Sequence, residues 1–303
     1  MFSVTILGRA SAKPTAESHA SAQLVNVSEQ YYLVDAGEGV QQQLFRYGIN
    51  PMKIRAVFIS HLHGDHLFGL FPLLSTMGLY GRQVALKIFA PHPFREMLES
   101  FLNYFEQDLP YKIEVEEVDT TAHRCIFENR TLEVWSIPLR HRVPCAGFHF
   151  REKEPPLNVH KHKIEQYNLS LRQIVAAKQG ENIVLDDGRE IQSAELTYRP
   201  FEPASYAYLS DTARSAVAAR RIKGVTLLYH EATYCRDMAR QAKERGHSTT
   251  ADAADIATKA EAKRLIIGHF SSRYKSIEPL LEEVQSLFPQ SDVACEGQTY
   301  IVR

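Results

Sequence analysis

A dense group of potential metal ligands directly follows one apolar run, and it constrains the fold of this chain more than any other feature. The segment that ends at His66 reads Phe-Ile-Ser-His-Leu-His-Gly-Asp-His, and three histidines and one aspartate fall within its last six residues. Zinc prefers imidazole nitrogen and carboxylate oxygen at ~2.0–2.2 Å. A turn after the apolar run Ile54–Ile59 can splay the first two histidines to one side and the last two ligands to the other. The segment therefore predicts a site that can serve two adjacent metal ions, with ligands His61, His63, Asp65 and His66.

Further candidate ligands each follow another apolar run that reads as a strand. Ligands at the carboxyl ends of several strands converge on one edge of a sheet, where α/β folds place their sites. These candidates are His141 after Leu132–Leu139, Asp211 after Tyr206–Ser210, His230 after Thr226–Tyr229 and His269 after Arg264–Gly268. The remaining histidines considered have no such placement and are interpreted as ordinary: His19, His92, His123 and His149.

Short apolar runs rich in Val, Ile, Tyr and Phe alternate with helical patterns, which predicts an α/β domain. The expected strands are Met1–Leu7, Tyr31–Val34, Ile54–Ile59, Leu132–Ile137, Tyr206–Leu209, Thr226–Tyr229, Arg264–Ile267 and Ala294–Ile301. The expected helices include the spacing of Leu67, Leu70, Phe71, Leu74 and Met77, the Ala-rich stretch Ala251–Thr258, and Ile277–Phe288 with Ser276 as its N-cap and Pro289 after its end.

One segment, residues 152–203, breaks this rhythm and is predicted to be an insertion. It contains Pro155-Pro156, a His/Lys-rich stretch at Val159–Lys163, an expected helix at Ser170–Lys178 and a hairpin signal at Asp187-Gly188. Basic side chains outnumber acidic ones between Arg151 and Lys178. A solvated insertion without a role is the alternative interpretation. The basic stretch makes Lys161 and Lys163 candidate contacts for the phosphates of an RNA.

The composition limits the classes of function. The chain has 303 residues, 44% hydrophobic and 23% charged, with a formal net charge of −1, so it is globular and not basic as a whole. It shows neither a signal peptide at its start nor an apolar run of membrane-spanning length, so we expect no membrane attachment and a cytoplasmic location. The four cysteines are far apart and form no CxxC pair, which favours reduced thiols: Cys125, Cys145, Cys235 and Cys295.

The ligand pattern resembles that of the metallo-β-lactamase superfamily, whose motif HxHxDH matches His61-Leu-His-Gly-Asp-His66. The resemblance implies an α/β fold of the αββα sandwich type with two Zn²⁺ ions per chain. Position 211 is Asp and not the Cys of many zinc β-lactamases, which favours a phosphodiesterase or a thioesterase. The resemblance further implies two ligand sets with one shared ligand: His61, His63 and His141 for one metal, Asp65, His66 and His269 for the other, and Asp211 as the bridge.

Five further segments closely resemble the ribonuclease Z family of tRNA 3′-processing endonucleases, in order and over nearly the whole chain. The family usually has Gly-Thr and Arg-Asn pairs in its N-terminal loop, where this chain reads Gly8-Arg9 and Ser18-His19. The inserted segment lies where the family carries a flexible tRNA-gripping arm, without a clear Gly-Pro motif. The matching segments are 35–43, 64–74, the HEAT sequence at 230–233, the HST sequence at 247–249 and 271–274.

Hydrolysis of an RNA phosphodiester requires a nucleophile, charge stabilisation and a proton for the leaving oxygen. Two metals can supply the first two requirements. Asp65 would orient the attacking water or take its proton. His247 would protonate the leaving oxygen, with Glu231 holding its ring and keeping it cationic. The alternative for Glu231 and His247 is an ordinary surface ion pair.

The favoured hypothesis is a zinc-dependent endoribonuclease that cuts precursor tRNA just after the discriminator nucleotide. It would leave a tRNA 3′-hydroxyl and a 5′-phosphorylated trailer. The resemblance implies one catalytic domain over residues 1–303, residues 152–203 as a substrate-binding arm, and a homodimer. Two alternatives stay open: a metal-dependent phosphodiesterase or thioesterase acting on small substrates, and a non-catalytic RNA-binding scaffold. Missing ligands would favour the scaffold, and a missing arm would favour the small-substrate enzyme.

Overall fold

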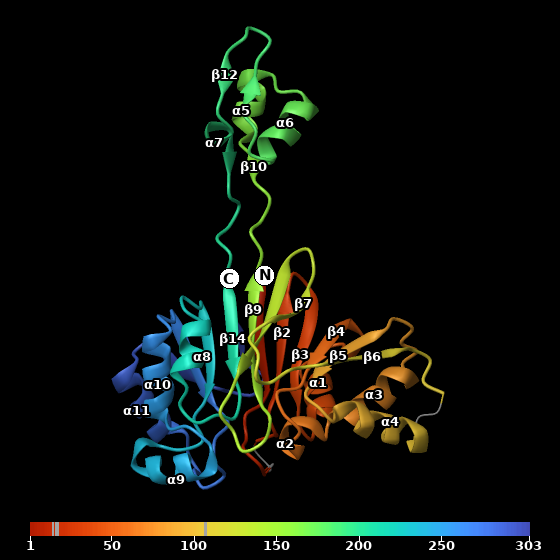
Figure 1. Ribbon diagram of the computed structural model, residues 1–303, viewed down its shortest axis with the longest axis vertical. Helices are drawn as coiled ribbons and strands as arrows, with labels where there is room; N and C mark the ends of the chain where they lie inside the picture. The colour runs from red at the N-terminus through yellow and green to blue at the C-terminus, as the bar shows by residue number, and fades with distance from the viewer. Residues whose placement is uncertain (14, 16–17, 106–107) are drawn as a thin grey trace. The chain divides into compact units, whose positions relative to one another are not determined.

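Two seven-stranded β-sheets form the main unit of the molecule (Figure 1). The computed structural model describes residues 1–13, 15, 18–105 and 108–303. The first sheet has the strand order β18-β1-β2-β3-β4-β5-β6, and β3 to β6 run parallel to one another. Its strands are β1 (Phe2–Gly8), β2 (Ala22–Val27), β3 (Gln30–Ala36), β4 (Ile54–Phe58), β5 (Leu86–Ala90), β6 (Ile113–Glu117) and β18 (Thr299–Ile301).

The second sheet has the strand order β17-β16-β15-β14-β9-β8-β7. Strands β14 to β17 are parallel, while β9 pairs antiparallel with β14 and β7 with β8. Both sheets therefore contain a parallel block, and carboxyl ends of parallel strands share one edge. The strands are β7 (Cys125–Glu128), β8 (Leu132–Pro138), β9 (Ala146–Glu152), β14 (Ser205–Leu209), β15 (Leu227–Glu231), β16 (Arg264–Gly268) and β17 (Ser291–Val293).

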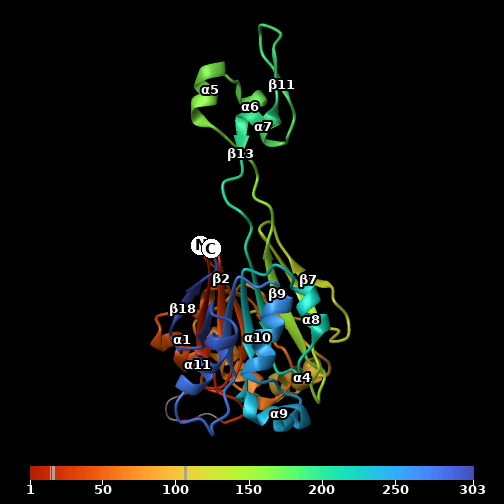
Figure 2. The same ribbon diagram turned by 90° about the vertical axis from the view of Figure 1, so that its left-hand side faces the viewer.

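Helices cover the outer faces of both sheets (Figures 1 and 2). The apolar sides of α1, α3 and α4 pack on the first sheet, and those of α8, α10 and α11 on the second. This arrangement is the αββα sandwich expected from the sequence. No helix in the described part of the chain is both long and apolar enough to cross a bilayer. The helices of this unit are α1 (Val40–Arg46), η1 (Pro51–Lys53), α2 (Gly64–Leu67), α3 (Leu70–Leu79), α4 (Phe94–Phe105), α8 (Ala216–Arg221), η2 (Arg236–Met238), α9 (Ala239–Arg245), α10 (Thr250–Lys259) and α11 (Glu278–Leu287).

Aromatic side chains fill the space between the two sheets. Phe58 of the first sheet is fully buried, and its ring stacks on that of Phe89 at a centroid distance of 4.8 Å. From the second sheet, Phe148 and Phe150 each place their ring centroid 5.4 Å from that of Phe58. Burial of such large apolar side chains is the main favourable contribution to packing one sheet on the other.

Three expected elements differ from the structure. The helical spacing that starts at Leu67 is broken into α2 and α3, because Gly69 lies against the backbone of Gly37, where a Cβ would come within 2.1 Å of an oxygen atom. The expected strand Ala294–Ile301 is wrong over its first half: Gly297 adopts φ +82° in a turn, and only β18 is extended. Helix α11 has its N-cap at Ile277 and not at Ser276.

A second compact unit comprises residues 129–132 and 152–203. It has a small apolar core of its own, to which Val159, Leu169 and Leu196 contribute. The expected helix and hairpin are both present: Ser170 caps α6 in a capping box, and Gly188 adopts φ +83° between β11 and β12. Its elements are β10 (Asn158–Val159), α5 (Lys161–Tyr167), α6 (Leu171–Lys178), β11 (Ile183–Val184), β12 (Glu190–Ile191), α7 (Ser193–Leu196) and β13 (Thr197–Tyr198).

Candidate metal centre and active site

The candidate ligands lie in segments that follow strands of both sheets; most are in loops, while Asp65 and His66 are on the short helix α2. His61 follows β4 of the first sheet, while His141, Asp211 and His269 follow β8, β14 and β16 of the second. Apolar strand residues are buried in the sandwich, so the polar residues directly after them are held at its edge. The loops bring together three groups of side chains with ligand atoms within 4.8 Å of one another: His61, His63, His141 and Asp211; Asp65, His66 and His269; and Asp211, His247 and His269.

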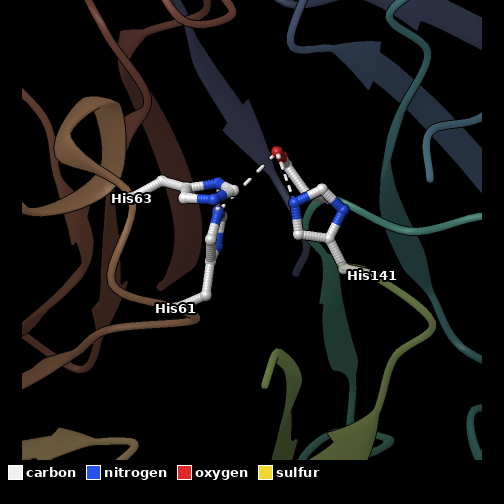
Figure 3. Close-up of side chains that lie close together, drawn as sticks. His61, His63 and His141 are labelled. Atoms are coloured by element: carbon white, nitrogen blue, oxygen red, sulfur yellow. Dashed lines mark hydrogen bonds and ion pairs between the residues drawn. The ribbon is translucent and has the colours of Figure 1, made fainter. Parts of the chain in front are cut away.

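The first group places three imidazoles around one carboxylate oxygen. In Figure 3, His61 and His63 face His141 across a gap. The Nε2 atom of His61 lies 2.9 Å from Nδ1 of His63. Oδ2 of Asp211 lies 3.7 Å from Nε2 of His61 and 3.8 Å from Nε2 of His141. All four ligand atoms thus converge on one point.

The second group lies beside the first. The Nε2 atoms of His66 and His269 are 3.3 Å apart, and Oδ2 of Asp65 lies 3.6 Å and 3.5 Å from them. His269 adopts φ +63°, a conformation that is uncommon for residues other than glycine and that turns its ring into the group.

Asp211 stands between the two groups and divides its carboxylate between them. Its Oδ1 atom lies 3.4 Å from His66 Nε2 and 3.2 Å from His269 Nε2, whereas Oδ2 faces the rings of the first group. The side chain is almost completely buried. A carboxylate in this position is arranged to bridge two cations.

Two buried atoms of the cluster fit a cation. Nε2 of His141 and Oδ1 of Asp211 make no hydrogen bond in the described part of the chain, although Oδ1 faces the rings of His66 and His269. A buried polar atom without a partner costs roughly 1–3 kcal/mol, and a metal ion at either point would remove that cost. The nitrogen and oxygen donors suit zinc and also manganese.

A second layer of hydrogen bonds orients the rings. Asp35 is fully buried; its Oδ2 lies 2.7 Å from His66 Nδ1, and its Oδ1 accepts the backbone N–H of Ser60 at 2.7 Å. The Ser60 hydroxyl lies 3.0 Å from His61 Nδ1, and the Thr233 hydroxyl 3.0 Å from His269 Nδ1. Such contacts leave the opposite ring nitrogen free for a metal. Asp35 was not expected in this role, although it too directly follows an apolar run.

The rings differ in protonation. Burial, and then the charge of His66, keeps the pKa of His61 well below its usual value, so this ring is neutral as a metal ligand must be. Burial also opposes the charged form of His66, but Asp211 and Asp35 outweigh it and raise the pKa of His66 well above the usual value. A metal ion that binds His66 must therefore displace a proton.

Glu231 and His247 form a buried pair beside the cluster. Glu231 is inaccessible to solvent, and its Oε1 atom lies 2.9 Å from Nδ1 of His247, whose side chain is 14% exposed. Glu231 Oε2 accepts the N–H and the hydroxyl of Thr233, so the carboxylate cannot rotate freely. Burial alone would lower the pKa of His247, but the Glu231 carboxylate raises it to about 9. The surface ion pair considered as an alternative does not describe such a buried pair.

Other candidates belong to none of these ligand groups among the described residues. His230 lies inside β15, its Nδ1 2.6 Å from the Glu231 carbonyl, and it belongs to none of the three ligand groups of the described residues. The expectation that His230 ends its strand is wrong, because β15 continues to Glu231. Lys161 and Lys163 lie on α5 of the second unit, and Lys163 lies over the Tyr167 ring.

Comparison with known proteins shows the family to which the chain belongs. Ribonuclease Z of Parabacteroides distasonis is 42% identical over 98% of this chain and 97% of the relative, and ribonuclease Z of Bacteroides thetaiotaomicron is 42% identical over 98% and 94%. The chain belongs to the ribonuclease Z family. Residues 2–153 also match the family model described as anti-Pycsar protein Apyc1, and this half of the chain belongs to that family too. The model covers the ligands up to His141 but not Asp211 or His269.

Solved structures agree on the fold of this ribonuclease Z family member. The short form of human tRNase Z matches with a TM-score of 0.72 and 24% identity over 99% of both chains. A metallo-β-lactamase fold protein from Bacillus subtilis matches with a TM-score of 0.71 and 19% identity over 99% of this chain and 100% of its own. The chain therefore has the metallo-β-lactamase fold.

The N-terminal loop departs from the usual ribonuclease Z sequence, and the residues found there make contacts of their own. His19 Nδ1 lies 2.8 Å from Glu296, and Arg9 Nη1 donates to the Ala294 carbonyl at 3.1 Å. The N–H of Ala12 donates to Asp65 Oδ2 at 2.7 Å, so this residue of the loop contacts the group of candidate ligands directly.

Proposed function

We infer that this chain is a metal-dependent endoribonuclease that removes the 3′ trailer from precursor tRNA, leaving a tRNA 3′-hydroxyl and a 5′-phosphorylated trailer. One observation carries the inference: in a chain of the ribonuclease Z family, six potential ligands contributed by both halves of the sandwich converge around the buried carboxylate of a seventh, Asp211. The scaffold alternative predicts lost ligands, and none is lost.

We propose two zinc ions per chain. His61, His63 and His141 would hold one, Asp65, His66 and His269 the other, and Asp211 both. When bound, the ions would supply Lewis-acid stabilisation of the phosphoryl oxygens and lower the pKa of a water molecule. The division of the Asp211 oxygens between the two groups supports this assignment.

We propose that Asp65 and the Glu231–His247 pair move the protons. Burial opposes the charged form of Asp65, but its contact with His269 holds the pKa well below the usual value, so the carboxylate is ionised and can accept a hydrogen bond from the attacking water. His247 keeps its proton because Glu231 faces Nδ1, and it can donate a proton to the leaving 3′-oxygen. His247 Nδ1 is only 3.9 Å from Asp211, within reach of the reaction centre.

We propose that residues 152–203 form a substrate-binding arm inserted in the catalytic domain 1–303. Its support is a compact unit with its own core, whose α5 carries Lys161 and Lys163. The excess of basic side chains is confined to the first half of the unit, up to Lys178, which includes α5. Phosphate contacts by lysines would give affinity without base sequence preference.

We also propose a homodimer that acts in the cytoplasm. The helices on the outer face of the first sheet expose large apolar side chains, including Leu79 (89%), Tyr80 (63%) and Tyr104 (83%). Phe45 and Tyr80 form a ring pair at 5.9 Å. Exposed apolar patches of this kind mark interfaces between proteins.

The decisive experiment determines the position at which the protein cuts a precursor tRNA. The zinc-loaded protein is incubated with a tRNA transcript that carries a 3′ trailer, and both products are sequenced and their ends determined. A single cut after the discriminator nucleotide, with a 3′-hydroxyl on the tRNA, supports the proposal. Hydrolysis of small diesters or thioesters with no cut in the transcript would favour the small-substrate alternative, and RNA binding without any hydrolysis the scaffold.

A further inference from the structure

Phe68 is an exposed aromatic residue beside the candidate metal centre. It directly follows α2, which carries Asp65 and His66, and 61% of its surface is open to solvent. An aromatic ring of this size normally gains free energy from burial, so a ring exposed at an active site suggests a partner there.

The backbone on both sides of Phe68 is fixed. A Cβ on Gly64 would come within 2.4 Å of the Phe68 ring, so the absence of a side chain lets the ring lie against the helix backbone. On the other side, Gly69 donates its N–H to the Ala36 carbonyl at 2.9 Å and approaches Gly37 too closely for a Cβ. The backbone that carries Phe68 is thus held in place, and its ring lies beside Gly64.

Phe68 lines two hollows in the surface, and Glu38 is the other residue that lines both. The first has a volume of about 420 Å³ and is lined by Phe68 together with His63 and Asp65 of the candidate metal centre. The second has a volume of about 450 Å³ and is lined by Phe68 together with Gln41 and Gln42 of α1. A strand that lies in the first hollow, next to these candidate ligands, would therefore contact the Phe68 ring.

We propose that Phe68 is the stacking platform for a nucleobase that flanks the scissile phosphate of precursor tRNA. The inference rests on the proposed function. With the phosphate at the metal cluster, an adjacent base is the nearest planar apolar group of the substrate, and the Phe68 ring shares a hollow with His63 and Asp65. Every base has a π-face, so stacking positions the strand independently of its base sequence. This property suits an enzyme that acts on many tRNAs.

The exposed aromatic residues on α3 and α4 do not share this position. Tyr80 and Tyr104 line neither of these two hollows. A second copy of the chain covers Phe68 only if the dimer interface extends to the metal centre, and the test includes this outcome.

The experiment compares Phe68→Ala, Phe68→Trp and the control Leu287→Ala, an exposed apolar residue of α11, on precursor tRNAs that are intact or abasic at one nucleotide on either side of the cut. We expect Phe68→Ala to raise KM by about 5- to 150-fold, the loss of one base–aromatic stack, with kcat and metal content little changed. Phe68→Trp and Leu287→Ala should behave like the wild type. The abasic change at the stacked nucleotide should weaken the wild type equally and should add nothing to Phe68→Ala.

A binding measurement keeps the test independent of turnover. With 2-aminopurine at the same nucleotide, fluorescence should be quenched on binding to the wild type and to Phe68→Trp, but not to Phe68→Ala. The stacking role would be overturned if the losses in binding from Phe68→Ala and from the abasic change simply added for both abasic substrates. It would also be overturned if all variants quenched the fluorescence equally. If Phe68→Ala changed the oligomeric state of the protein in solution, the ring would be assigned to a dimer contact, and the proposed stacking role would be overturned. Failure of the wild type to cut any trailer refutes the proposed function instead.

Discussion

Oε1 of Glu231 lies 2.9 Å from Nδ1 of His247, with the carboxylate wholly buried and the imidazole at the rim of the metal cluster. The pair has a consequence for catalysis. His247→Ala should retain its metal and lose turnover on precursor tRNA by roughly 10²–10⁴-fold, because the leaving oxygen then has no proton donor. A diester with a very good leaving group needs no donor and should be much less affected. An equal loss on both substrates would refute the role of His247 as the acid.

The pH profile depends on the same pair. The pKa of His247 is raised to about 9, so the acid form persists below that pH and is lost as the pH rises through it. Glu231→Gln removes the charge that stabilises the imidazolium, so the alkaline limb of kcat should move to lower pH. The measurement is kcat against pH for both proteins at saturating substrate. An alkaline limb that stays in place would show that another group sets it.

Asp211 tests the number of metal ions. Asp211→Ala should lose most of the bound metal and all activity, because its two oxygens face both ligand groups. The matched control is Asp255→Ala, which breaks surface ion pairs with Arg214 and Lys259 and should change neither quantity. Elemental analysis should find close to two ions per chain in the wild type. One tightly held ion that survives Asp211→Ala would contradict a bridged pair.

The arm should separate tRNA recognition from chemistry. Replacement of residues 152–203 by a short Gly/Ser linker should leave the metals bound and a small activated diester hydrolysed, since every proposed ligand lies in the other unit. Processing of precursor tRNA should collapse through weakened binding. Full-rate cleavage of tRNA by the deleted protein would show that the segment is not the substrate-binding arm.

Two point substitutions in the arm test the same role with a smaller change to the protein. Lys161→Ala with Lys163→Ala should weaken tRNA binding and reduce its salt dependence, by about one unit of slope for each lysine–phosphate interaction removed. The control replaces two exposed lysines of the other unit, Lys223 and Lys263. Equal losses in both double variants would indicate a general effect of charge.

The sequence located eight of the eighteen strands in the described part of the chain, and the ligands, because both signals are local. A buried strand shows as an apolar run, and a ligand loop shows as polar residues directly after it, as at His61 after β4. Local signals failed where distant segments meet. Helical spacing could not reveal the break between α2 and α3, which arises from the approach of Gly69 to Gly37, and an apolar run could not reveal the turn at Gly297.

The sequence by itself indicated metal-dependent hydrolysis, because it places all seven potential ligands in segments that directly follow apolar runs. It also carried the resemblance to the family. Only the tertiary structure decided how the ligands are shared: which Asp211 oxygen faces which rings, and that Asp35 and Thr233 orient His66 and His269. The physical reason is that these contacts join the two sheets. The Ser60 and Ser210 hydroxyls, 2.9 Å apart, are separated by 150 positions in the chain and meet only when the sandwich closes.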